Sequence, residues 1–259
     1  MFDTTYIYNG MEIYWYIVLF MASTIGGIVG SMSGGAGMIT MPILLLSGLN
    51  PIIALAVNKL QACVGSFTSA AHYYKQGLVD MRQGRILMII GVTFGALGTA
   101  TVQYIELSLL SKILPFAMII VCAYFLFSKN ISDEDKAKNP NKIILYITMV
   151  LAGFYGGLLG VGIGSFILAI LVSIGGYGLS KAVAYSRWIV FSVNLASACI
   201  FIISGNILWA LGIIMCIGQV IGASIGAKLA IKHGAKIIRP LIVGTSFILS
   251  LQLIIKEFF

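Results

Sequence analysis

Hydrophobic residues fill long stretches of this chain, and polar residues are confined to short segments between them. Most of the apolar stretches are about 20 residues long, which is the length of a helix that crosses a hydrocarbon core of about 30 Å. Strands of a membrane barrel are about 10 residues long and alternate apolar with polar positions, and this chain does not. The pattern therefore predicts an all-α, polytopic membrane protein.

Composition supports a membrane protein and argues against a nucleic-acid partner. The chain is 59% hydrophobic and 9% charged, whereas an average soluble protein is about 25% charged. So few charged residues cannot cover the surface of a water-soluble domain. The 16 Lys and Arg exceed the 8 Asp and Glu, but most of them lie in short connections, where the positive-inside rule explains them. We therefore expect a lipid bilayer as partner and no nucleic acid.

The first half of the chain predicts a broken helical hairpin followed by longer helices. The run at 31–37, SMSGGAG, is too rich in glycine for the interior of a stable helix. Irregular backbone at membrane depth is tolerated only beside protein or a watery cavity, so we expect this run to line a site. The expected elements are a first helix at 14–30, a short apolar piece at 38–47 and helices at 51–74, 86–104 and 109–127.

The second half of the chain repeats this order. When Lys59 is set on Arg187, Gly48 falls on Gly176, and further Gly, Ala and Pro positions align in the same order. The counterparts are 143–159 for the first helix, 160–164 for the glycine run, 166–174 for the short piece and 179–204 for the long helix. We therefore divide the chain into a first transmembrane repeat at 1–128, a cytoplasmic linker at 129–142 and a second transmembrane repeat at 143–259.

The distribution of basic residues predicts opposite topologies for the two repeats. Lys and Arg gather around 75–85, 129–142 and 228–239, which should be cytoplasmic, whereas the uncharged turn 204–207 should lie outside. Each half then crosses the membrane an odd number of times, and both termini lie on the non-cytoplasmic side. We expect about 8–10 spans in all, counting broken or short helices. Inverted repeats of this kind are the plan of many secondary transporters.

Lys59 and Arg187 are the most informative residues of the chain. Both lie inside long apolar segments, where a basic side chain costs about 2.5–3.5 kcal/mol and generally faces a polar cavity on a substrate path. No acidic residue in the apolar segments offers them a partner. The pair predicts a cavity in which an anion binds between the halves. The alternative is that each side chain snorkels to the membrane interface.

Neighbouring polar residues and the glycine runs complete the predicted site. Polar side chains near the two cations can bind substrate oxygens, or they can hydrogen-bond other helices. The glycine runs can present free helix N–H groups to an anion, or they can allow close packing. His72 can take part in proton coupling or lie at the interface. The candidate substrate-binding residues are Lys59, Arg187, Asn58, Gln61, Ser186, Asn194, Gly34, Gly35, Gly162 and Gly164.

The sequence carries no signature of catalysis, of a cofactor or of a metal site. The motifs HExxH, GxSxG and GxxxxGK[ST] are absent, so we expect no enzyme activity, no catalytic residue, no cofactor and no bound metal. The four cysteines lie within apolar runs and form no CxxC pair. We expect them to be small buried hydrophobic residues.

Several motifs together point to a family. They are the glycine run with the following Met41-Pro42, the helix start Pro51…Ala54-Leu-Ala56, and the repeat of this unit after the linker. With them the chain resembles the sulfite exporter TauE/SafE family of membrane permeases. The segments NKLQAC at 58–63 and IIRP at 237–240 resemble a subgroup known only as membrane transporters. The resemblance implies transport of small sulfur-containing or organic anions.

The sequence thus predicts a secondary transporter in the cell inner membrane. Its expected substrate is a small anion, either a sulfur-containing one such as sulfite or an organosulfonate, or an organic carboxylate. Assembly into a homo-oligomer is left open. Two alternatives are an anion-selective channel and a membrane assembly component that transports nothing.

Overall fold

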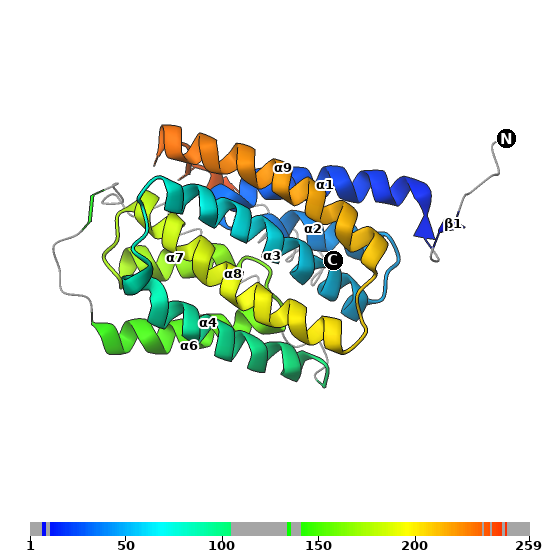
Figure 1. Cartoon of the computed structure of the whole chain (residues 1–259), viewed down its shortest axis with the longest axis horizontal. Helices are drawn as coiled ribbons and strands as arrows, with labels where there is room; N and C mark the ends of the chain where they lie inside the picture. Colours follow the sequence, from blue (N-terminus) through cyan, green and yellow to red (C-terminus); the bar gives the residue numbers. More distant parts are fainter. Residues whose placement is uncertain are drawn as a thin grey trace.

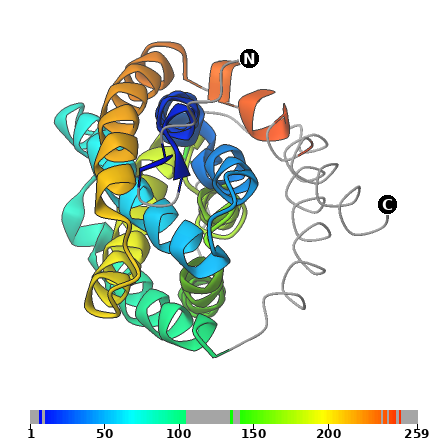
Figure 2. The same cartoon turned by 90° about the vertical axis from the view of Figure 1, so that its right-hand side faces the viewer.

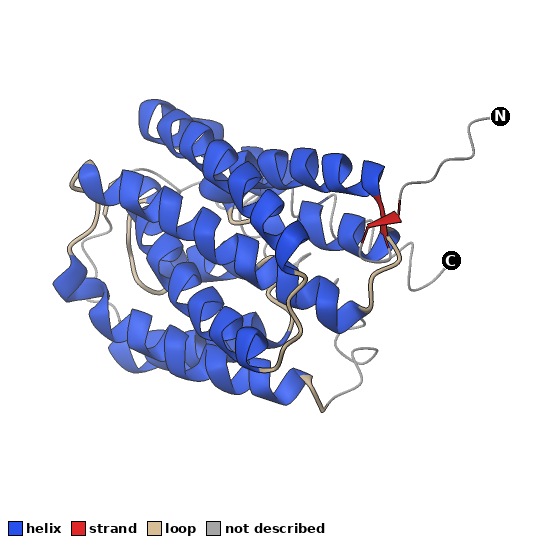
Figure 3. Cartoon of the chain, turned by 45° about the vertical axis from the view of Figure 1, so that its right-hand side comes forward, coloured by secondary structure: helices blue, strands red, loops and turns tan. Residues whose placement is uncertain are grey.

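The computed structural model describes residues 7–8, 11–104, 134–135, 141–234, 236–238, 240–244 and 247. The helix expected at 109–127 and most of the linker lie outside this part of the chain. Two short strands, β1 (Ile7–Tyr8) and β2 (Met11–Glu12), form an antiparallel ribbon before the first helix (Figure 3). The helices are α1 (Ile13–Ser33), α2 (Ala36–Leu46), α3 (Pro51–Lys75), α4 (Met81–Val102), α6 (Lys142–Leu158), α7 (Ile163–Ser173), α8 (Leu179–Ile203) and α9 (Trp209–His233) (Figure 1).

The helices of the second half match those of the first in order, and several match in length. The short helices α2 and α7 both have 11 residues, and the central helices α3 and α8 both have 25. Equivalent helices run in opposite directions along the bundle, as blue α1 and green α6 do in Figure 1. The predicted all-α fold with two inverted-topology repeats is confirmed.

The two halves are interlocked, because each packs mainly on the other. Helix α1 lies along α9, and its equivalent α6 lies along α4 (Figures 1 and 2). Helices α3 and α8 meet at the centre and also contact α9 and α4, respectively. Glycines make these approaches close: a Cβ on Gly98 would collide with the carbonyl oxygen of Phe154, and one on Gly222 with that of Thr24. Glycines of α4 and α9 thus allow close helix packing.

The outer surface of the bundle suits a bilayer. Five described helices, α1, α3, α4, α8 and α9, are long and apolar enough to cross a membrane. Large apolar side chains point outward from the bundle, for example Ile17 at 65% exposure and Ile203 at 86%. The 11 residues of α2 or α7 extend only about 16 Å at 1.5 Å per residue, roughly half of the hydrocarbon thickness. Each of these short helices is therefore too short to cross the hydrocarbon core alone.

Several helix boundaries differ from the prediction. Helix α1 continues to Ser33, three residues beyond the expected end, and α2 starts at Ala36, so only Gly34 and Gly35 of the glycine-rich run are not helical. Helix α7 starts at Ile163, three residues before the expected start. Helix α4 begins at Met81, five residues before the expected start at residue 86, because the Asp80 side chain accepts a hydrogen bond from the Arg82 N–H and caps the helix. Helix α3 starts at Pro51 as expected, with Asn50 as its cap.

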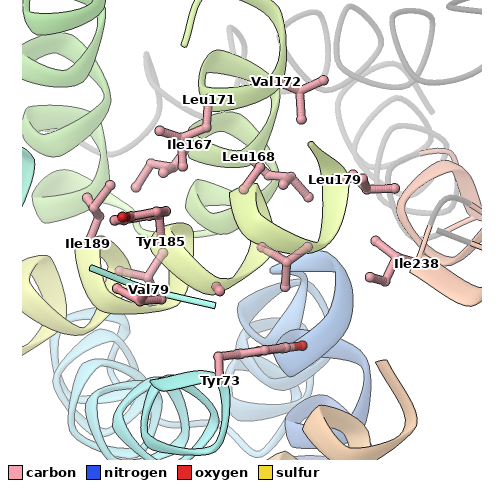
Figure 4. Packing of buried hydrophobic residues seen from close by; sticks show 14 of the residues in the cluster. Tyr73, Val79, Ile167, Leu168, Leu171, Val172, Leu179, Tyr185, Ile189 and Ile238 are labelled. Atoms are coloured by element: carbon pink, nitrogen blue, oxygen red, sulfur yellow. The ribbon is translucent and has the colours of Figure 1, made fainter. Parts of the chain in front are cut away.

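The largest hydrophobic cluster holds the first half of α8 in place. It joins α7 and α8 to Tyr73 and Val79, and Figure 4 shows the rings of Tyr73 and Tyr185 within it. The hydroxyl oxygen of Tyr185 accepts a hydrogen bond of 3.0 Å from the Asp80 N–H, and Tyr73 donates one of 3.0 Å to the carbonyl oxygen of Ser31. The first bond fixes α8, which carries Arg187, against the start of α4, and the second joins the end of α3 to the end of α1.

The cysteines differ in their surroundings. Cys63 is buried and Cys216 is partly buried, but Cys199 is exposed on the outer face of α8. The expectation of a buried cysteine was therefore wrong at Cys199, whose position on α8 leaves the side chain exposed. Cys122 lies outside the described residues.

Candidate functional site

The two glycine-rich breaks cross at the centre of the bundle. Gly34 ends α1 with a φ of 88°, and Gly160 follows α6 with a φ of 73°. Gly164, at the start of α7, lies so close to the first break that a Cβ on it would come within 2.5 Å of the Gly34 Cα. The hydroxyl of Ser165 donates a hydrogen bond of 2.8 Å to the carbonyl oxygen of Ser33. The breaks of the two halves are thus in direct backbone contact.

Lys59 and Arg187 each reach into the break of the opposite half. Lys59 on α3 donates a hydrogen bond from Nζ to the carbonyl oxygen of Gly156, in the last turn of α6. Arg187 on α8 donates one from Nη1 to the carbonyl oxygen of Gly30, in the last turn of α1. The last carbonyls of a helix carry the negative end of its dipole. Each cation therefore caps the first helix of the other half.

Both cations are buried, and glycines provide their space. Lys59 is 0% exposed and Arg187 is 3% exposed. A Cβ on Gly160 would lie 2.5 Å from the Lys59 Nζ, and one on Gly164 would lie 2.8 Å from the Arg187 Nη2. Within the described residues neither cation has a carboxylate partner. Neither side chain reaches the surface, as snorkelling would require.

A cavity of about 30 Å³ lies beside Arg187, between α1, α2, α3, α8 and α9. It has space for one or two water molecules. Arg187, Asn58, Asn194 and Gly34 are the candidate residues that line it. Lys59 lies behind Gly160, which forms part of the wall. The remaining candidates, which do not line the cavity, are Gln61, Ser186, Gly35, Gly162 and Gly164.

Arg187 is oriented toward this cavity by its neighbour Ser186. The Ser186 hydroxyl oxygen accepts hydrogen bonds from Nε at 3.2 Å and from Nη2 at 2.8 Å of the guanidinium. A guanidinium has five N–H donors, so Arg187 keeps donors for a further partner after its bonds to Ser186 and Gly30. Ser186 thus acts on the cavity through Arg187.

Asn194 brings an unpaired amide to the same cavity. The residue is 3% exposed and lines the cavity, and its side chain has no hydrogen-bond partner among the described residues. This amide is therefore free to hydrogen-bond a polar occupant of the cavity.

A chain of amides fixes the orientation of Asn58. Its Oδ1 accepts hydrogen bonds from the Thr40 hydroxyl at 2.7 Å and from Gln61 Nε2 at 2.9 Å. Gln219 Nε2 in turn donates to Gln61 Oε1 at 3.1 Å. Gln61 therefore links α3 to α9. The Nδ2 group of Asn58 remains a hydrogen-bond donor at the cavity. Sequence reasoning missed Thr40 and Gln219, although Gln219 is a lone polar residue in a long apolar run.

The start of α2 adds backbone donors. Ala36 and Gly37, the first residues of this helix, line the cavity. The first N–H groups of a helix have no partner within it, and they favour anions. Among the described residues, no acidic side chain lines the cavity. The site is therefore a set of hydrogen-bond donors around one fixed positive charge.

The family of the chain follows from comparison with known proteins. Residues 19–253 match the sulfite exporter TauE/SafE family. The chain belongs to this family.

Relatives in three bacteria carry the same general name. A "Probable membrane transporter protein" of Haemophilus influenzae is 33% identical over 241 residues, which cover 93% of this chain and 94% of the relative. "Probable membrane transporter protein ORF9" of Sinorhizobium is 35% identical over 237 residues, or 91% of each chain. "Probable membrane transporter protein YfcA" of Escherichia coli K12 is 33% identical over 238 residues, or 92% of this chain and 88% of the relative. No solved structure matches the chain.

Two further side chains of this TauE/SafE family member, His72 and Trp188, do not line the cavity. His72, in the last turn of α3, shares a hydrogen bond of 2.9 Å with the Thr68 carbonyl through Nδ1. Trp188 packs edge-on against Phe67 and Phe191 and does not line the cavity. The family and the helices identify a multi-pass membrane transporter, and the donor-lined cavity is its candidate substrate site.

Proposed function

We propose that this protein is a secondary transporter that moves a small anion across the cytoplasmic membrane. The substrate class is a sulfur-containing anion such as sulfite or an organosulfonate, or an organic carboxylate. The observation that carries the proposal is the cavity at the crossing of the glycine breaks. It combines the buried guanidinium of Arg187, the unpaired amide of Asn194 and the N–H groups at the start of α2, and no acidic residue in the described part of the chain lines it.

Charge balance favours an anion over a neutral or cationic solute. Arg187 and Lys59 are both buried, and no carboxylate neutralises either of them in the described part of the chain. A buried charge without a counter-charge is strongly unfavourable. A sulfonate or carboxylate next to Arg187 would supply the counter-charge and accept hydrogen bonds from the amides around it.

The arrangement of the halves supports a carrier rather than an open channel. Inverted repeats move against each other around a central site in many secondary transporters. Here the division into repeats at 1–128 and 143–259, with a cytoplasmic linker at 129–142, is part of the proposal. The two caps, Lys59 to Gly156 and Arg187 to Gly30, join the repeats at their contact. A change in either cap would therefore change how the repeats sit on each other.

Thermal unfolding of the purified protein tests the proposal. The melting temperature is measured with sulfite, sulfoacetate, methanesulfonate, taurine or acetate. Potassium chloride and choline chloride are the controls. Stabilisation by at least one of the five solutes, lost in Arg187→Lys, supports the anion site. If none of them stabilises the protein and none crosses reconstituted vesicles, the protein is not the proposed transporter. Currents without saturation or counterflow would favour the channel, and a co-purifying partner without any flux would favour the assembly component.

A further inference from the structure

Lys59 and Arg187 occupy equivalent places in the two halves, but their chemistry differs. A guanidinium stays protonated at any pH that proteins tolerate, whereas a buried lysine amine can give up its proton. Arg187 lines the cavity and Lys59 does not. One half therefore contributes a fixed positive charge to the site, and the other contributes a charge that can be removed.

The contacts of Lys59 suit an amine that exchanges its proton. A protonated lysine has three N–H donors, and the Gly156 carbonyl oxygen is the acceptor of Nζ within the described residues. The side chain is completely buried and has no carboxylate partner there. A permanent ammonium would be costly in such surroundings, whereas a neutral amine would not.

The elements around Lys59 offer no better proton carrier. Helices α2 and α7 have no titratable side chain. The hydroxyl of Tyr155 on α6 donates to the Val161 carbonyl oxygen. The other titratable or charged groups on the packed helices are Cys63, His72, Tyr73, Tyr74 and Lys75 on α3, Arg187, Tyr185, Lys181 and Cys199 on α8, Lys142 and Tyr146 on α6, Arg82 and Arg85 on α4, Tyr14 and Tyr16 on α1, and Cys216, Lys228, Lys232 and His233 on α9.

Gly160 connects Lys59 to the cavity. It forms part of the cavity wall, and a Cβ on it would lie 2.5 Å from the Lys59 Nζ. An anion in the cavity would thus be separated from the amine by this one residue, in surroundings of low dielectric where attraction between opposite charges is strong. An anion would favour the protonated amine, and by linkage the protonated amine would favour the anion.

We propose that Lys59 is the proton-binding residue of the transporter, and that anion and proton cross the membrane together. The inference rests on the proposed function. When an anion enters beside Arg187 from one side, the Lys59 amine takes a proton from water on that side. When the anion leaves on the other side, the ammonium returns the proton to water there. No other reactant is needed.

Calorimetry on the unmodified protein tests the coupling directly. The anion is titrated in two buffers of different ionisation enthalpy at about pH 8, which gives the number of protons taken up per anion. Sulfoacetate, methanesulfonate and acetate are used because they remain ionised at this pH. We expect uptake of up to about one proton per anion. Lys59→Met should bind the anion with no proton uptake. Lys75→Met, an exposed lysine of the same helix, should behave as the unmodified protein.

Transport in vesicles provides a second readout. An inward proton gradient should drive accumulation of labelled sulfoacetate by the unmodified protein. Lys59→Arg, which keeps the charge but cannot release it, should retain exchange of anion for anion and lose accumulation. Anion binding without proton uptake, or gradient-driven accumulation by Lys59→Arg, would overturn the inference and leave the proposed function standing. If none of the three anions binds or crosses, the proposed function fails as well.

Discussion

The guanidinium of Arg187 on α8 donates a hydrogen bond to the carbonyl oxygen of Gly30, at the end of α1 in the opposite half. The same relationship recurs between Lys59 on α3 and Gly156 on α6. A basic residue at membrane depth thus has a structural task, because it caps a helix, and the remaining donors of Arg187 still face the cavity. Substitutions at Arg187 and at the residues around it separate these two roles.

Arg187→Lys should weaken anion binding. The lysine keeps the charge but loses the planar donors that Ser186 orients. Loss of a hydrogen bond to a charged group costs about 1.5–3 kcal/mol, which corresponds to binding at least about 10-fold weaker. Binding is measured by the concentration dependence of thermal stabilisation. Arg82→Lys, at an exposed position on α4, is the matched control and should bind normally. Equal affinity in both variants would exclude Arg187 from the site.

Asn194→Ala should separate stability from binding. Because the Asn194 amide has no partner in the described part of the molecule, its loss should leave the melting temperature without anion unchanged or slightly higher. The stabilisation by anion should fall. Asn58→Ala should instead lower the melting temperature, since it breaks the bonds from Thr40 and Gln61. Full anion stabilisation of Asn194→Ala would show that this amide does not contact the substrate.

Gly160→Ala should destabilise the fold more than Gly48→Ala. Both residues have positive φ, 73° and 80°, so both alanines carry about 1–2 kcal/mol of backbone strain. Only the Cβ at position 160 also meets the Lys59 Nζ, while nothing lies within 4 Å of a Cβ at position 48. Thermal unfolding in detergent should therefore show the lower melting temperature for Gly160→Ala. Equal melting temperatures would mean that the Lys59 side chain does not occupy the space beside Gly160.

Asp135 in the linker should stabilise the start of α8 in a pH-dependent way. Its Oδ1 accepts a hydrogen bond of 2.8 Å from the Gly178 N–H, and its Oδ2 lies 2.7 Å from the Lys181 Nζ. The Gly178 N–H first, and then Lys181, hold the pKa of Asp135 below its usual value. A carboxyl group with a lowered pKa stabilises the fold above its unfolded pKa of about 4, and this contribution is lost as the pH falls through the folded pKa.

The check is the melting temperature of Asp135→Asn as a function of pH. The variant should melt below the unmodified protein at about pH 7, and the difference should shrink as the pH falls below the unfolded pKa of about 4. If the difference in melting temperature stays constant over this pH range, the destabilisation comes from the changed shape of the side chain and not from the lost charge of Asp135.

Much of the fold could be predicted from the sequence, because membrane helices have a defined length and the halves repeat. The alignment of Lys59 with Arg187 is the register that relates α3 to α8, two helices of 25 residues each. The start of α4 was missed because Arg82 and Arg85 suggested a loop, although Asp80 caps the helix before them.

The site was harder to predict than the fold. The sequence indicated two cations at the same depth but not their partners, because backbone carbonyls of Gly30 and Gly156 carry no sequence signal. Each cation crosses to the other half, so Lys59 ends behind Gly160 and only Arg187 lines the cavity. These contacts between halves depend on how the two halves pack together, and local sequence patterns do not encode that packing.

The most direct test of the central claim is exchange of labelled sulfoacetate in vesicles that contain the purified protein. The claim predicts saturable uptake that unlabelled sulfoacetate inside the vesicles accelerates, with loss of at least about 10-fold in Arg187→Lys and none in Arg82→Lys. Uptake that neither saturates nor shows counterflow, or that is equal in the two variants, would contradict an anion carrier built around Arg187.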